Sequence, residues 1–544
     1  MRKDLTSYAL VFFGLIATAQ AADPPGTPSA AVVMAGRTAA SSTADHSKFK
    51  ELDRDFKSGP EVTRACLQCH TEAARQVMRT KHWTWEFLNP GTGQRLGKKN
   101  VINNFCTAVP SNYEFCTACH VGYGWKDANF DFSSEQNVDC LVCHDTTGTY
   151  RKLPGFAGHP VYQDTEFPPK SGKIVKAVDL KKVAQHVGKS SRKTCGSCHF
   201  FGGGGDGVKH GDLDSSLTQP GRHLDVHMAK DGLNFSCGTC HLTSGHDVPG
   251  SRYAPTAMPK GRIIRGQKET GNPASCESCH GVEPHAMQRL NTHARKIACQ
   301  TCHIPEYARG GIPTKTLWDW STAGRLDKEG KPFKVKDSTG REAYDSKKGD
   351  FRWETHVIPE YIWFNGTVNY TLRETRLDPT QVVKINSFEG SPMDGRSKIW
   401  PIKVFRGKQP YDVGHNQLVV FHTWGKDDAA LWTNFNWERA IEWGMREIGA
   451  QYSGKFAFVA TEMSWPITHM VAPKEDALGC AQCHAPATGV GRLDQVPGVY
   501  MPGRSANRAL DTFGWGLSAL ALLGVLVHGG LRILTARKRE GDTA

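Results

Sequence analysis

The chain is short of apolar residues for its length. Only 39% of its 544 residues are hydrophobic, and the mean hydropathy is −0.46. A chain long enough for two or three domains ordinarily buries large cores of side chains. The shortage therefore indicates that something other than side chains fills part of the interior. The 56 glycines and 29 prolines indicate a loop-rich fold.

The sequence also lacks a concentrated stripe of one charge. The formal net charge is +13, but the Lys and Arg residues are dispersed along the chain. This distribution argues against a nucleic-acid partner, because proteins that bind nucleic acids usually gather their Lys and Arg residues in a stripe with aromatic residues between them. A phosphate loop is also excluded at the glycine run Gly202–Gly207, because no Gly-Lys-Ser/Thr follows it.

Long apolar runs are confined to the two ends. Arg2 and Lys3 precede the apolar run 8–17, and small residues around Ala21 complete the pattern of a secretory signal peptide over residues 1–21. Residues 22–47, rich in Ala, Pro, Ser and Thr, are predicted to form a flexible leader. The alternative for the first run is a short membrane anchor, but it is too short to span a bilayer comfortably.

A second apolar segment, residues 512–535, is long enough to be a transmembrane helix. The alternative is a buried core helix. An exported body with one later span leaves residues 536–544 as a cytoplasmic tail. We therefore predict a protein held at the periplasmic face of the inner membrane by its C-terminal helix.

Cysteine is used almost entirely in one pattern. Sixteen of the 17 cysteines fall in eight Cys-x-x-Cys-His motifs. The motifs are Cys66/Cys69/His70, Cys116/Cys119/His120, Cys140/Cys143/His144, Cys195/Cys198/His199, Cys237/Cys240/His241, Cys276/Cys279/His280, Cys299/Cys302/His303 and Cys480/Cys483/His484.

This spacing is the attachment signal of c-type haem. Two thiols on one helical turn bond the haem edge, and the adjacent histidine reaches the iron. A zinc site would not need histidine directly after every second cysteine, and a disulfide framework needs no such regularity. The sequence therefore predicts eight covalently attached haem c groups, whose acidic propionates would balance the excess of cations.

Fifteen histidines lie outside the motifs and supply candidates for the second axial ligand. Electron-transfer haems usually have two strong ligands, which limits their reorganisation. The best local contexts predict distal ligands at His82, His210, His227, His246, His285, His293 and His469. For each one the alternative is a surface or hydrogen-bonded histidine, and the pairing with particular haems stays open.

The motifs are unevenly spread. Residues 48–310 carry seven of them, and residues 311–485 form a haem-poor packing region that ends in the eighth. Residues 486–511 link it to the apolar segment. We expect a mainly α and loop multihaem cytochrome c, with a few short strands in the haem-free region at 417–422 and 455–459, and a helix over 427–449.

The order and spacing of the motifs resemble the octahaem cytochromes c of the tetrathionate reductase family. The resemblance covers roughly residues 60–485 and is carried by segments 102–106, 179–185, 200–214, 299–305, 359–366 and 468–471. Soluble members lack the apolar C-terminal segment, so that segment is a departure.

The resemblance implies a reaction site at the haem of the second motif, with seven other haems as bis-histidine relays. A lysine amine would ligate this haem, and its matching residue would be Lys182, with Lys181 as the near alternative. Asp179, Asn103 and the one unpaired cysteine, Cys106, would line the site. The alternatives are a solvated helix lysine and a small buried thiol.

Two functions fit these observations. The first is a respiratory oxidoreductase that takes electrons from a membrane cytochrome b or quinol-oxidising partner and reduces a small sulfur or nitrogen oxyanion. Tetrathionate is the favoured substrate, with nitrite or hydroxylamine as alternatives, and the reverse oxidation stays open. No Cys-x-x-Cys-Lys motif occurs, which argues against a dedicated nitrite reductase. The second is a non-catalytic electron conduit.

Overall fold

The haem motifs lie on a series of short helices. The computed structural model describes residues 44–103, 105–253, 274–485, 489–501 and 508–541. The predicted signal peptide, most of the leader and the end of the tail lie outside this part of the chain. The motif helices are α2 (Gly59–Cys66), α5 (Tyr113–Cys116) with η3 (Thr117–Cys119), α6 (Leu141–His144), α8 (Arg192–His199), α9 (Cys237–Cys240), α10 (Glu277–His280), α12 (Cys299–His303) and α15 (Cys480–Cys483).

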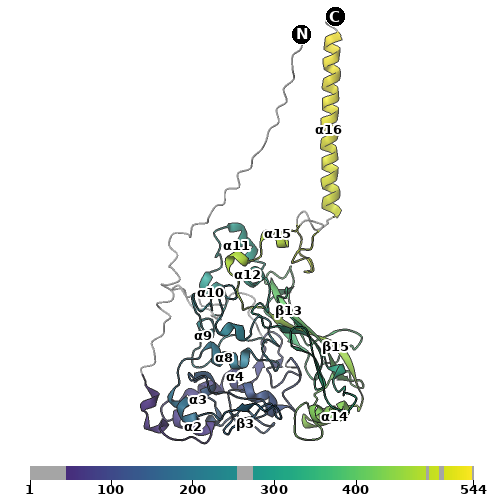
Figure 1. Ribbon diagram of the computed structural model, residues 1–544. Coiled ribbons are helices and arrows are strands. Elements are labelled where there is room, and N and C mark those ends of the chain that lie inside the picture. The colour runs from purple at the N-terminus through teal and green to yellow at the C-terminus, as the bar shows by residue number, and fades with distance from the viewer. Residues whose placement is uncertain (1–43, 104, 254–273, 486–488, 502–507, 542–544) are drawn as a thin grey trace.

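The motif helices labelled in Figure 1 lie along one side of the molecule, from α2 at the bottom through α8, α9 and α10 to α12 and α15 at the top. Further helices between them are α3 (Ala73–Met78), α4 (Lys81–Thr84), α7 (Leu180–Gln185) and α11 (Gln288–Ala294). Each motif occupies about one helical turn, which places its two thiols on the same side of the helix. The series is therefore laid out as a row of attachment points.

A nine-stranded sheet stands beside the helices, with the path order β11-β15-β13-β5-β8-β7-β6, while β14 and β9 also pair with β13. Its strands are β5 (Thr314–Asp319), β6 (Lys334–Lys336), β7 (Glu342–Asp345), β8 (Gly349–Glu354), β9 (Glu360–Phe364), β11 (Val383–Lys384), β13 (Lys398–Asp412), β14 (Gln417–Leu418) and β15 (Phe456–Pro466). Three small two-stranded pairs are β1 (Phe87–Leu88) with β2 (Arg95–Leu96), β3 (Thr165–Glu166) with β4 (Ile174–Val175), and β10 (Val368–Tyr370) with β12 (Asn386–Phe388).

The sheet is larger than the sequence suggested. β13 has 15 residues and pairs antiparallel with β15 from Ile402 to Asp412. Pro401 and Pro410 interrupt its apolar alternation, so it does not have the usual appearance of a central strand. The helix expected over 427–449 is divided into α13 (Leu431–Asn434) and α14 (Trp437–Glu447), because Phe435 takes a left-handed backbone conformation at φ 57°.

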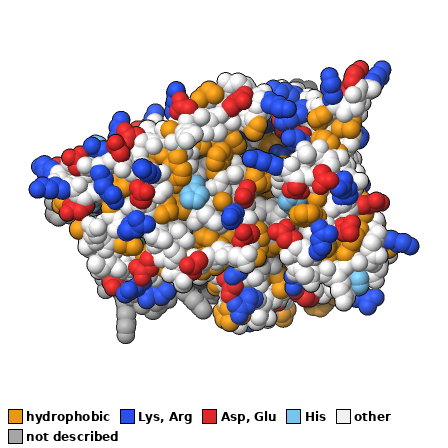
Figure 2. All heavy atoms as spheres, turned by 90° about the horizontal axis from the view of Figure 1, so that it is seen from below, with side chains coloured by type: hydrophobic (Ala, Val, Ile, Leu, Met, Phe, Trp, Pro, Cys, Tyr) orange, Lys and Arg blue, Asp and Glu red, His pale blue; other side chains and the backbone are white. Residues whose placement is uncertain are grey.

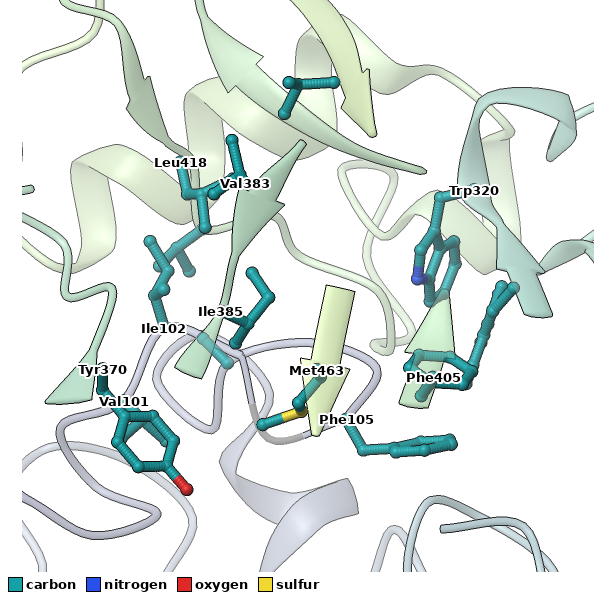
Figure 3. Packing of buried hydrophobic residues seen from close by; sticks show 14 of the residues in the cluster. Val101, Ile102, Phe105, Trp320, Tyr370, Val383, Ile385, Phe405, Leu418 and Met463 are labelled. Atoms are coloured by element: carbon teal, nitrogen blue, oxygen red, sulfur yellow. The ribbon is translucent and has the colours of Figure 1, made fainter. Parts of the chain in front are cut away.

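The main core joins the sheet to the loop that precedes the second motif. Figure 3 shows Val101, Ile102 and Phe105 of this loop beside Ile385 and Met463 of the sheet region. Burial of such side chains contributes roughly 1.5–3 kcal/mol each. On the face seen from below in Figure 2, cationic and anionic side chains are interspersed with patches of apolar ones. The sheet therefore packs directly against the loop that leads into the second haem motif.

The C-terminal helix α16 (Arg508–Gly541) extends away from the rest of the molecule (Figure 1). Its stretch Ala509–Ala536 has a mean hydropathy of 1.9 and is not buried against any other part of the described structure. By length and composition this stretch can cross a membrane.

Candidate active site at the second motif

Seven of the eight motif histidines face a histidine from outside the motifs. The pairs and their ring-centroid separations are His70–His46 (6.3 Å), His199–His82 (6.2 Å), His144–His246 (6.4 Å), His280–His227 (5.9 Å), His241–His469 (6.4 Å), His303–His285 (6.0 Å) and His484–His293 (6.2 Å). Two imidazoles that share one metal, each with a bond of about 2 Å, have centroids roughly 6 Å apart. The residues therefore fit a haem iron between each pair.

Hydrogen bonds orient several of these rings in the way a metal ligand requires. Nδ1 of His144 lies 2.7 Å from the carbonyl oxygen of Gly188, and Nδ1 of His241 lies 2.9 Å from that of Pro249. Because Nδ1 carries the proton in such a bond, Nε2 keeps its lone pair for a metal.

Six of the seven predicted distal histidines lie opposite a motif histidine, and the seventh does not. The ring of His210 instead lies edge-on to Trp465 at 5.0 Å. Its place in the set is taken by His46, which faces His70 from the short helix η1 (His46–Lys48). No local signal marks His46, because it lies in the predicted leader and meets its partner only through the fold.

His120 differs from the other seven motif histidines. Its side chain is fully buried among aromatic rings, with Trp125 at 4.7 Å, Trp83 at 5.2 Å and Phe130 at 5.6 Å. Its Nε2 lies 2.7 Å from the carbonyl oxygen of Trp83, and its Nδ1 has no hydrogen-bond partner within the described residues. Burial lowers the pKa of His120 to about 3, so the ring is neutral and Nε2 carries the one N–H.

The backbone of His120 is also fixed in place. The Lys152 ammonium donates to the His120 carbonyl oxygen at 2.5 Å and forms an ion pair with Asp139 at 3.0 Å. Asp139 in turn accepts hydrogen bonds from Tyr123 and Tyr150. Because the buried pair is fully hydrogen-bonded, it holds the chain rigidly. Nε2 of His120 thus lies against the Trp83 carbonyl oxygen, whereas each of the other seven motif histidines faces another imidazole.

The loop before the second motif holds Asn103 and Cys106 together, as expected. Asn103 is buried, and its side-chain oxygen accepts a hydrogen bond from the Phe105 N–H at 2.6 Å. Phe105 has a strained φ of 107° and stacks on Phe405 at 4.2 Å. Strain of this kind persists only where packing enforces it, and it clusters at functional sites. Burial raises the pKa of the Cys106 thiol, which Lys348, Lys315 and Lys209 counteract.

A different lysine from the predicted one lies near this loop. Lys209 is 7% exposed, and its ammonium lies 4.7 Å from the centre of the Trp465 ring. Burial lowers its pKa well below the usual value, with further repulsion from Arg252 and Lys98. The sulfur atoms of Cys119 and Cys106 lie near it as well. No described oxygen lies within hydrogen-bond distance of its amine.

The sheet holds Lys209 in position. The buried Lys403 of β13 donates to the carbonyl oxygens of Val208 (3.2 Å) and Lys209 (3.0 Å), and to Thr314 Oγ1 at 2.6 Å. Thr314 itself donates to the Gly207 carbonyl at 2.8 Å. Residues of β5 and β13 therefore fix the backbone at the end of the glycine-rich run by hydrogen bonds. This fixes the point from which the Lys209 side chain extends.

The predicted pair Asp179 and Lys182 lies elsewhere. Asp179 caps α7 by accepting the Lys182 backbone N–H at 2.9 Å, and both side chains are exposed. The neighbouring Lys181 forms an ion pair with Asp53 at 2.8 Å. A lysine that binds a haem iron must be held out of water beside it, whereas the Lys182 side chain is exposed on α7. Asp206 and Lys209 have the same three-residue spacing as Asp179 and Lys182, and the buried amine of Lys209 meets the requirement that the exposed amine of Lys182 does not.

Thiols of different motifs also contact one another. Direct contacts join Cys66 to Cys140, Cys119 to Cys198, Cys195 to Cys237 and Cys276 to Cys299. The second motif therefore adjoins the fourth, and the fourth adjoins the fifth. Cofactors attached at these positions would be close enough to exchange electrons.

Two of the predicted attachment thiols, those of Cys69 and Cys279, have no polar side-chain partner within the described residues. Cys69 is exposed in the turn after α2, whereas Cys279 is partly buried within α10. Their backbone N–H groups donate to the carbonyl oxygens of Cys66 and Cys276, each at 3.2 Å. Attachment to a haem edge through a thioether needs no polar partner, so these surroundings do not conflict with the predicted role of either thiol. Their assignment follows from the motif, whose turn keeps each one beside its first cysteine.

Comparisons with known proteins agree with the motifs. A family model for bacterial cytochrome c matches residues 315–487, and one for cytochrome c554 and c-prime matches residues 65–145. An uncharacterised protein of Archaeoglobus fulgidus is 28% identical in an alignment of 244 positions that covers 37% of this chain and 80% of that protein.

The crystal structure of an octahaem cytochrome c from Shewanella oneidensis is similar over most of the chain. It matches with a TM-score of 0.71 and 44% sequence identity, over 81% of this chain and 94% of that one. With eight attachment motifs in this fold, the chain belongs to the octahaem cytochromes c and carries eight covalently attached haem c groups.

Proposed function

We propose that this octahaem cytochrome c is a respiratory oxidoreductase that reduces a small sulfur or nitrogen oxyanion, with tetrathionate as the favoured substrate, at the haem of the second motif. The observation that carries the proposal is the diversion of His120 Nε2 to the Trp83 carbonyl. A haem without its motif ligand needs another one, and a single replacement leaves one axial position for substrate.

Lys209 is the residue that we assign as this replacement ligand. A lysine binds iron only as the neutral amine, and deep burial without a hydrogen-bond acceptor favours that form. The haem groups supply one-electron transfer when bound. The protein's part is to present the Lys209 amine, to hold Cys106 and Asn103 beside the open position, and to exclude water from both.

The seven histidine pairs at the other motifs support an electron relay. Two strong ligands keep an iron six-coordinate and closed to substrate, which suits transfer of electrons without chemistry. The contact of Cys119 with Cys198 gives the second motif a neighbour in the fourth. Cleavage of the central S–S bond of tetrathionate takes two electrons and gives two thiosulfates, with no net uptake of protons.

Membrane attachment and the electron donor are part of the same proposal. The exposed apolar stretch of α16 would anchor the body at the periplasmic face of the inner membrane. A membrane cytochrome b or another quinol-oxidising protein would then supply electrons. The motif nearest to α16 in the chain is the eighth, on α15 (Figure 1).

The test is ligand binding to the purified protein. We expect cyanide or nitrite to bind one haem in eight, seen by optical and EPR spectroscopy, and Lys209→Ala to change that haem while lowering turnover by at least about a hundredfold. Lys182→Ala is the matched control and should behave as wild type. Eight haems closed to both ligands, indifferent to Lys209, would instead support the alternative function, a non-catalytic electron conduit.

A further inference from the structure

A second buried lysine lies on the sheet side of Cys106. Lys315 of β5 is 4% exposed, and three aromatic rings surround its ammonium. The ring centres lie 3.3 Å away for Phe351, 4.0 Å for Trp318 and 4.9 Å for Trp353. Rings at these distances stabilise a cation through their quadrupoles, by up to about 2 kcal/mol in a desolvated site.

An irregularity in the strand creates this arrangement. Residues three apart in a regular strand point to opposite faces of the sheet. The register of β5 against β8 shifts between Lys315 and Leu317, so that Thr316 is an extra residue. This bulge turns Lys315 to the same face as Trp318. Bulges often re-aim side chains beside active sites, and here the re-aimed side chain is the lysine.

The Lys315 ammonium has no counter-ion within the described residues. Among the described residues no carboxylate or carbonyl oxygen lies within ion-pair or hydrogen-bond distance of it, and its more distant charged neighbours are Lys348, Lys403 and Glu342. Lys348 is half-buried nearby, over the Trp432 ring. Burial lowers the pKa of Lys315 well below its usual value. An anion beside this caged amine would favour its protonated form, so the cage holds a lysine that a bound anion charges.

We propose that Lys315 is an anion-binding residue of the substrate site, where its ammonium holds an oxygen of a sulfur or nitrogen oxyanion beside Cys106. The proposal deepens the proposed function and rests on it for the identity of the substrate. It requires that a small anion reach the space between Cys106 and the aromatic rings. Lys348, a further cation near both Cys106 and Lys315, would add to the attraction of the anion.

Cys106 provides the probe. It is the one cysteine outside the eight motifs, so in the mature protein it is the one thiol free to be alkylated. We would compare its alkylation by iodoacetate, an anion, and by iodoacetamide, its neutral analogue, in the intact holoprotein. The ratio of the two rates cancels differences in the reactivity of the thiol and reports attraction of the anion alone.

The expected result is that Lys315→Met lowers the iodoacetate-to-iodoacetamide ratio by on the order of tenfold. Methionine keeps the apolar stem in the aromatic cage and removes the charge. The matched control is Lys347→Met, which removes the exposed lysine next to Lys348. It should leave the ratio unchanged. An unchanged ratio in a folded Lys315→Met protein overturns the proposal.

A second measurement needs no variant. In the wild-type protein, added sulfate, an oxyanion that does not react with iodoacetamide, should slow alkylation by iodoacetamide in a saturable way, because the bound anion covers the thiol. Absence of protection at saturating anion also overturns the proposal. Neither readout depends on an open haem, so an anion preference without cyanide binding would sink the proposed reductase while the Lys315 site stands.

Discussion

The ring of His120 and the backbone of Trp83 are joined by a hydrogen bond, with Nε2 2.7 Å from the carbonyl oxygen. In a motif histidine that binds iron, this is the nitrogen that must stay free. His144 has the opposite arrangement, because its Nδ1 contacts the Gly188 carbonyl at 2.7 Å and its Nε2 faces His246. The histidine of one sequence motif therefore has two different hydrogen-bonding arrangements within one chain.

This difference predicts how two matched variants behave. His120→Phe keeps an aromatic ring in the cage and removes no ligand, so the EPR spectrum of the ferric protein and its cyanide binding should stay as in wild type. His144→Phe removes a ligand, so one low-spin signal should be lost and a new site for cyanide should open. A loss of the substrate-binding haem in His120→Phe would show that His120 does bind iron.

The planes of the paired rings predict two classes of low-spin signal. The interplanar angles are steep for His82–His199 (75°), His144–His246 (74°), His227–His280 (65°) and His293–His484 (76°), and shallow for His46–His70 (18°), His241–His469 (29°) and His285–His303 (10°). Axial ligand orientation governs the anisotropy of ferric haem. We expect four highly anisotropic signals and three rhombic ones by EPR; another ratio would contradict the pairing.

The haem attachment sites could be predicted from the sequence because their chemistry is local. Two thiols and a histidine must lie on one helical turn, and five consecutive residues encode that requirement. Distal ligation is not local. His46 and His70 lie on separate elements that meet only in the folded chain, and nothing near His46 in the sequence signals the contact.

The choice of lysine shows the same limit. Asp179 and Lys182 lie at the start of a short helix, where side chains have defined positions. Lys209 instead follows a glycine run, which is typical of a loop. What distinguishes them is burial, and burial of Lys209 depends on Lys403, almost two hundred residues away. A search for Asp-x-x-Lys spacing finds both pairs, but only the fold shows which amine lies out of water.

Lys403 predicts a dependence of stability on pH. Burial lowers its pKa from 10.5 to about 7 in the folded protein. Between these values the unfolded chain holds the proton and the folded chain does not, so the free energy of unfolding rises as the pH rises from 7 to 10.5. We expect wild type to gain on the order of a few kcal/mol relative to Lys403→Met across this window. Denaturant titrations at several pH values measure it, and parallel curves would contradict it.

The C-terminal helix predicts a simple separation of anchoring from redox chemistry. The apolar stretch of α16 is not buried against the rest of the described structure. A chain that ends at Met501 should therefore keep all eight haems, its optical spectrum and its cyanide binding, but should leave the membrane fraction without detergent. Retention of the shortened protein on membranes after a high-salt wash would show that another surface anchors it.

Asp212 predicts a shift in the potential of one haem. It is buried, and its carboxylate lies 3.2 Å from Nδ1 of His469, which faces His241. A carboxylate partner makes an imidazole a stronger donor and stabilises the oxidised metal. Asp212→Asn should therefore raise the potential of this haem by tens of millivolts, measured by spectroelectrochemistry.

The matched control for Asp212 is Asp225→Asn. Asp225 is equally buried and also holds backbone N–H groups, those of His227 and Val471, but its carboxylate lies 3.9 Å from the His227 ring nitrogen. Both variants lose charge-assisted hydrogen bonds to backbone, which costs each about 1–3 kcal/mol of stability. Only Asp212→Asn should move a potential, because only Asp212 contacts a ring nitrogen at hydrogen-bond distance. Equal shifts in the two variants would assign the effect to lost negative charge in general, and the specific role of Asp212 would be refuted.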